Sequence, residues 1–69
     1  MPLSMMGVGT RHKIKRVAGN DAVRKRLGSM GFTEGASVEI VSESYGNLIL
    51  GVMDSRVAVD KDLASRILV

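Results

Sequence analysis

The sequence LGSMGFTEG, residues 27–35, decides how this chain folds, because it ends an amphipathic helix and leads into a region rich in β-forming residues. Gly31 stands at the C′ position, where helices favour a residue with positive φ. Phe32 follows at C″ and can pack back on Leu27 at C3, as in a Schellman motif. The stretch therefore predicts the end of a helix and a sharp change in chain direction.

The helix ahead of this stretch is predicted over residues 21–30. Asn20 or Asp21 can cap its start by accepting hydrogen bonds from free backbone N–H groups. Three residues spaced i, i+4 and i+7 form one apolar face: Val23, Leu27 and Met30. We therefore expect the helix to pack one face on a core and to leave the remainder in solvent.

Short β-strands are predicted on both sides of this helix. Residues 10–17 alternate like a strand with one wet face, and we expect a bulge where Arg16-Val17 breaks the alternation. After the helix, strands are predicted at 37–43, 48–53, 56–59 and 66–69, with turns at 45–47 and 54–55 and a capped helical turn at 61–65. This order is typical of a small, partly open barrel, so the predicted fold is mainly β, with about five strands and one inserted helix.

The length of the chain, 69 residues, predicts a single small domain over 1–69. Six residues are predicted to stabilise its core: Leu27, Phe32, Val38, Ile40, Leu50 and Val57. The chain has no cysteine, which excludes disulfides and thiolate chemistry and fits a reducing compartment. Its first residues lack the basic and long apolar regions of a signal peptide, so we expect a cytoplasmic protein.

The positive charge of the chain is concentrated in its first half. The net charge is +3, and residues 1–35 carry seven Lys or Arg against two acids, whereas residues 36–69 carry three against five. Such an asymmetry favours an acidic partner, either protein or nucleic acid. The alternative interpretation is a solvated surface, with the cations at 24–26 complementing the C-terminal end of the helix dipole.

Few residues of this chain could perform catalysis or hold a metal. His12 is the only histidine, and no GxxxxGK phosphate loop occurs. Asp60 and Asp62 are the carboxylates closest in sequence, and they are better explained as acids at a helix start than as an acid–base pair. One histidine cannot build a two-His iron site within one chain, and methionine is usually a core filler. We therefore predict a protein that is not an enzyme and has no intrinsic metal site or cofactor.

Segments spread over almost the whole chain resemble the ferrous iron transport accessory proteins, the FeoA family. The matching segments are Pro2-Leu3-Ser4, Met30-Gly31-Phe32, Val38-Glu39-Ile40-Val41, Asn47-Leu48-Ile49, Arg56-Val57-Ala58-Val59 and 63–69. The resemblance implies an SH3-like β-barrel with an inserted helix. It also implies a cytosolic partner of the transporter FeoB, a membrane protein with a cytosolic GTP-binding domain, and no small-molecule substrate. The turn at 45–48 departs from the Gly-Asp-Pro that many members carry there.

Protein binding is the function that these observations favour. An SH3-like barrel offers a groove between its first long connection and a neighbouring hairpin turn, here 17–35 and 45–47. The residues predicted to bind the partner are Arg24, Met30, Tyr45 and Arg56. Each has a structural alternative: Met30 can fill the core, Arg24 can be solvated, Tyr45 can pack over the barrel end, and Arg56 can pair with Glu39 or Glu43.

Two further possibilities remain open from the sequence. Small basic barrels often bind nucleic acid, although Phe32 and Tyr45 are the only aromatic residues available for base stacking. A homodimer is conceivable through edge-to-edge pairing of the apolar residues 67–69.

Overall fold

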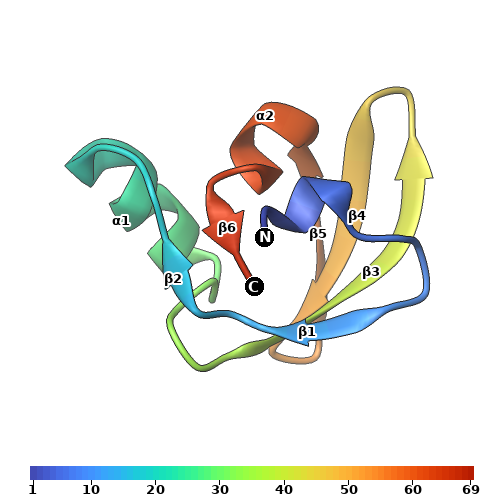
Figure 1. Ribbon diagram of the computed structural model, residues 1–69, viewed down its shortest axis with the longest axis horizontal. Coiled ribbons are helices and arrows are strands. Elements are labelled where there is room, and N and C mark those ends of the chain that lie inside the picture. Colours follow the sequence, from blue (N-terminus) through green and yellow to red (C-terminus); the bar gives the residue numbers. More distant parts are fainter.

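Two antiparallel sheets form the framework of the protein, whose computed structural model describes residues 1–69 (Figure 1). The larger sheet has the order β1-β3-β4-β5, and the smaller one pairs β2 with β6. The elements are η1 (Leu3–Met5), β1 (Arg11–Lys13), β2 (Arg16–Val17), α1 (Asp21–Ser29), β3 (Ser37–Ser44), β4 (Asn47–Val52), β5 (Ser55–Asp60), α2 (Lys61–Ala64) and β6 (Ile67–Leu68).

The segment 10–17 is not the single strand that we predicted. It divides at Ile14-Lys15 into β1, which pairs with β3, and β2, which pairs with β6. The backbone N–H of Ile14 donates to Ala36 O at 2.9 Å, and that of Lys15 donates to Leu68 O at 2.7 Å. The chain therefore changes sheets between two consecutive residues, at the point where Ile14 turns its side chain into the core.

Helix α1 is capped at both ends as its sequence predicts. Asn20 is the N-cap, and its Oδ1 accepts from Val23 N at 2.9 Å. At the other end Phe32 N donates to Leu27 O at 3.0 Å and Gly31 N donates to Gly28 O at 3.0 Å, the two bonds of a Schellman motif. Gly31 has a φ of 100°, which only glycine adopts freely. The helix ends at Ser29, with Met30 as its C-cap.

The two hairpins of the large sheet have two-residue turns. The β3–β4 turn is Tyr45-Gly46, and the β4–β5 turn is Met53-Asp54, with φ of 50° and 62°. We predicted the second turn at Asp54-Ser55, which is wrong by one residue. The observed register pairs all of β4 with β5, whereas the predicted turn would shift β5 by two positions and leave the start of β4 without partners in that strand.

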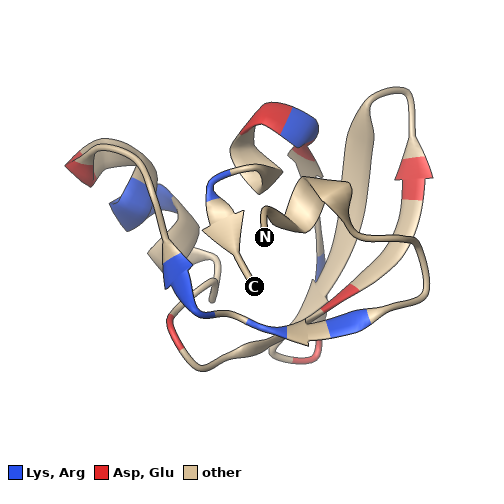
Figure 2. Ribbon diagram, viewed as in Figure 1, with Lys and Arg blue, Asp and Glu red and all other residues tan.

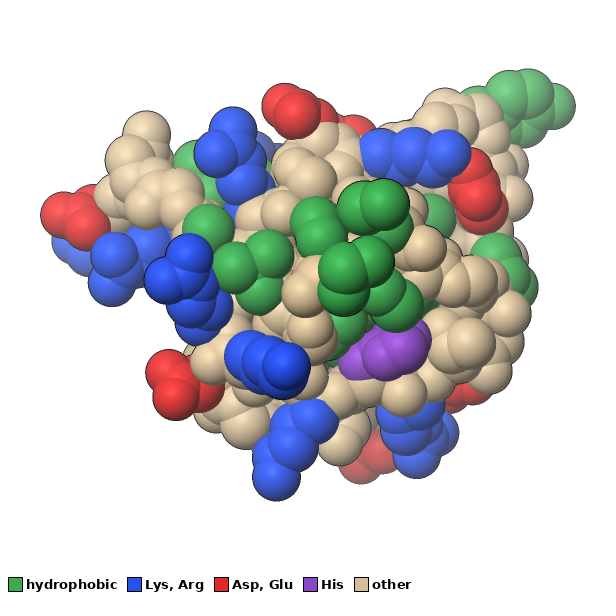
Figure 3. All heavy atoms as spheres, viewed as in Figure 1, with side chains coloured by type: hydrophobic (Ala, Val, Ile, Leu, Met, Phe, Trp, Pro, Cys, Tyr) green, Lys and Arg blue, Asp and Glu red, His purple; other side chains and the backbone are tan.

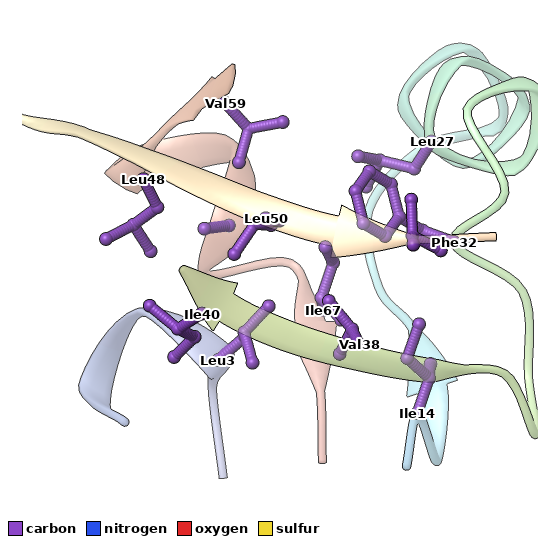
Figure 4. Packing of buried hydrophobic residues seen from close by; sticks show 12 residues of the cluster. Leu3, Ile14, Leu27, Phe32, Val38, Ile40, Leu48, Leu50, Val59 and Ile67 are labelled. Carbon is purple, nitrogen blue, oxygen red and sulfur yellow. The ribbon is translucent and has the colours of Figure 1, made fainter. Parts of the chain in front are cut away.

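Twelve buried hydrophobic residues form one core cluster, and half of them lie on the inner face of the large sheet (Figure 4). Five of the six predicted core residues are buried: Leu27, Phe32, Val38, Ile40 and Leu50. Val57 is only half-buried. Leu3 was missed by the sequence analysis, and η1 places it among Ile40 and the other core residues.

The two ends of the chain pair with each other through backbone hydrogen bonds. Pro2 forms a bridge with Leu68, and the amino group of Met1 donates to Val69 O at 2.8 Å. Val69 N donates in return to Met1 O at 2.8 Å. The apolar stretch 67–69, which we considered as a free edge for dimer formation, is therefore already paired within the chain.

Candidate protein-docking surface

One side of the molecule carries most of the basic side chains. Lys and Arg residues follow one another along β1, β2 and α1 (Figure 2). Figure 3 shows the same side chains around exposed hydrophobic groups and the single histidine, His12. The charge asymmetry of the sequence thus becomes a basic face, since the two strands and the helix lie next to one another in the fold.

A hollow of about 600 Å³ opens between α1 and β2 on this side. Its lining residues are Arg16, Val17, Asp21, Arg24, Lys25, Gly28, Phe32, Thr33 and Glu34. The helix contributes positions 21, 24, 25 and 28, which share one face because of the helical repeat. Gly28 leaves part of this face open, since a Cβ there would meet no heavy atom within 4 Å. The hollow therefore combines three cations and two acids around an apolar base.

A second hollow, of about 400 Å³, lies on the outer face of the large sheet near the β4–β5 turn. The strand registers place four of its lining residues in one cross-strand row: Arg11, Glu39, Gly51 and Arg56. Gly51 supplies no side chain of its own to the row, and the side chains nearest to it are those of Val41 and Glu39. Sequence analysis missed this hollow, although a glycine inside an otherwise apolar strand is a recognised signal of such a gap.

The ion pairs near this hollow differ from those considered from sequence. Glu39 accepts from Arg11 at 3.3 Å, and Glu43 pairs with Lys61. Arg56 therefore pairs with neither of the acids that we had considered for it, and it has no salt bridge. Its exposed guanidinium is free to meet a carboxylate from outside the chain.

The four predicted binding residues do not share one groove. Arg24 lines the hollow beside α1, and Arg56 lines the hollow on the sheet. Tyr45 is fully exposed at the β3–β4 turn, which lies on the opposite side of the molecule from α1 (Figure 1). Met30 is half-buried and packs against the core. The structure thus separates residues that the sequence predicts to form a single site.

No group of three or more His, Cys, Asp or Glu side chains is arranged to hold a metal ion. The ring of His12 is hydrogen-bonded through Nε2 to Thr10 Oγ1 at 2.9 Å. None of the helices has the length and apolar character needed to cross a membrane.

The fold is that of an SH3-like barrel with a helix inserted between its second and third strands. The FeoA domain family matches this chain over residues 1–69, so the chain belongs to that family. A comparison with curated proteins gave no match.

Solved structures agree with this assignment. The crystal structure of an iron uptake regulatory protein, FeoA, is 39% identical, with a TM-score of 0.87 over 96% of this chain and 88% of that one. The zinc complex of Stenotrophomonas maltophilia FeoA, described as a prokaryotic SH3 domain protein, is 28% identical, with a TM-score of 0.86 over 99% and 87% of the two chains. A manganese-dependent transcriptional repressor, 13% identical with a TM-score of 0.87 over 97% and 39%, shares the fold alone.

Proposed function

We propose that this protein is a non-enzymatic accessory factor of ferrous iron uptake that acts in the cytoplasm. It docks on the cytosolic GTP-binding domain of a FeoB-type transporter and contacts the membrane only through that partner. The observation that carries the proposal is the match to the FeoA family along the entire chain. The Stenotrophomonas maltophilia relative is itself described as a candidate activating factor of ferrous iron transport, which supports the same role.

The hollow beside α1 is the docking place that we favour. It has the larger volume of the two, and Arg16, Arg24 and Lys25 give it the charge to attract an acidic segment. Its side chains make no salt bridge within the chain, so they can pair with a partner without breaking an internal contact. Tyr45 and Arg56 then belong to separate surfaces, and Met30, the C-cap of α1, packs against the core.

Calorimetric titration into the purified GTP-binding domain, with and without nucleotide, tests the proposal. We expect binding that changes with nucleotide, and we expect Arg24→Glu to weaken it at least about tenfold, or ~1.4 kcal/mol. Arg26→Glu is the matched control, because Arg26 lies on the same helix with the same charge but does not line the hollow.

The comparison of Arg24→Glu with Arg26→Glu shows whether the hollow beside α1 is the surface that binds the transporter domain. Equal losses would indicate a general charge effect, and unchanged affinity in both would place the contact elsewhere, with Tyr45→Ala and Arg56→Glu as the next variants. A mixed-sequence RNA titrated in parallel addresses the nucleic-acid alternative. Salt-dependent heat with RNA and none with the transporter domain would overturn the proposed function.

A further inference from the structure

Strand β5 has one hydrogen-bonding edge without a partner strand. It pairs with β4 on one side and is the last strand of its sheet. The two-residue turn makes Val52↔Ser55 a hydrogen-bonded pair, and such pairs alternate along an antiparallel ladder. The backbone N–H and C=O groups of Arg56 and Ala58 therefore point to the free edge. Neither residue forms a backbone hydrogen bond with a turn or loop of the chain.

The opposite edge of the same sheet is shorter and more densely charged than the edge of β5. Strand β1 has only three residues, two of them cationic, which discourages pairing with another chain. Strand β5 has six residues, SRVAVD, without proline or glycine. Its centre is the small and exposed Ala58. The strand has no bulge against β4, and its two charges, Arg56 and Asp60, lie on either side of this centre rather than at it.

Two unpaired charges lie on the outer face of β5, one on each side of Ala58. Arg56, Ala58 and Asp60 are exposed, whereas Val57 and Val59 face inward. Neither charged side chain takes part in a salt bridge. Asp60 accepts from Leu63 N at 2.6 Å through Oδ1 as the N-cap of α2, and no cationic side chain of the chain pairs with its carboxylate.

We propose that β5 pairs with β5 of a second copy of this chain, antiparallel and centred on Ala58. In this register the N–H and C=O of the two Ala58 residues bond to each other. Arg56 lies opposite Asp60 of the second copy, and the same pair recurs on the other side of the twofold axis. A twofold contact needs such a self-complementary surface, and the pattern Arg-x-Ala-x-Asp provides it.

The dimer is weak, because the paired segment is short and its ion pairs are exposed to solvent. Backbone hydrogen bonds along the edge supply most of the attraction, and the two ion pairs select this register over its neighbours. The surface is distinct from the hollow beside α1, so dimer formation does not depend on the proposed docking of a transporter.

Disulfide trapping tests the register directly, since the chain has no cysteine of its own. Directly opposite residues in a hydrogen-bonded pair have Cα atoms about 5.5 Å apart, within the range that a disulfide spans. We expect Ala58→Cys to form a covalent dimer under mild oxidation at least about tenfold faster than Ser42→Cys, the control on an inner strand of the same sheet. Equal rates for both variants would overturn the proposal.

Sedimentation equilibrium over a wide concentration range gives the second test. We expect self-association of the unmodified chain at high concentration and its loss in Ala58→Lys, which places two like charges face to face. Ser42→Lys carries the same added charge and is expected to associate like the unmodified chain. A monomer at every concentration, or equal association by both lysine variants, contradicts the proposed interface.

Discussion

The inserted helix α1 and the β3–β4–β5 meander are stabilised in different ways. The meander is a three-stranded ladder, interrupted by one register shift between Ile40 and Ser42. Six buried side chains lie on its inner face: Val38, Ile40, Leu48, Leu50, Val52 and Val59. In α1, Leu27 is the one buried residue, and the helix depends on its caps and on the adjacent Phe32. The meander therefore carries stability, while most of the surface of α1 is left for contact with other molecules.

Phe32→Ala should give the largest effect, because Phe32 joins these two regions. Its side chain is 1% exposed and lies beside Leu27 in the core (Figure 4). We expect a loss of about 3–5 kcal/mol in the free energy of unfolding, measured by urea denaturation. A loss below about 1 kcal/mol would contradict this assignment and show that α1 is not anchored through Phe32.

Asn20→Ala should affect α1 more than the meander. It removes the acceptor for Val23 N and is expected to cost about 1 kcal/mol. Amide hydrogen exchange is the measurement, since it reports stability residue by residue. We expect faster exchange in α1 at unchanged protection of β4, and an equal change in both regions would mean that they unfold as one unit.

Gly51→Ala should have the smallest effect and the opposite sign. A Cβ at Gly51 would lie 3.5 Å from Val41 Cγ2, which is ordinary contact, and its backbone is not in the positive-φ region. We expect the meander to gain about 0.4–1 kcal/mol, because alanine restricts the unfolded chain. Thermal unfolding measures it, with Gly31→Ala as the contrasting variant, which must destabilise because Gly31 has a φ of 100°.

The parts of the fold that follow local rules could be predicted from the sequence. The caps of α1, the Schellman ending and the N-cap at Asp60 depend on neighbouring residues, and the structure contains all of them. The division of 10–17 between two sheets could not be predicted, because its cause is Leu68, more than fifty residues away. The burial of Leu3 in the core could not be predicted for the same reason, because it also depends on residues that are far away in the sequence.

The candidate site was less predictable than the fold. Arg24, which the sequence predicts to bind a partner, lines a hollow, whereas Arg16 and Gly28 on the same hollow are not among the predicted residues. Tyr45 was assigned to the same groove as Arg24 by analogy with the barrel class. A turn and a helix that are separated by a whole strand can lie anywhere relative to each other, and only the three-dimensional arrangement shows that these two lie apart.

The change of sheets at Ile14-Lys15 has a consequence for how the chain folds. The β3–β4–β5 meander closes through two-residue turns, whereas β2 pairs with β6 across about fifty residues. Short loops close at a lower entropic cost than long ones, so we expect the meander to form early and the β2–β6 pair last. Arg16 then approaches its final neighbours only at the end of folding, and the basic face is complete only in the native state.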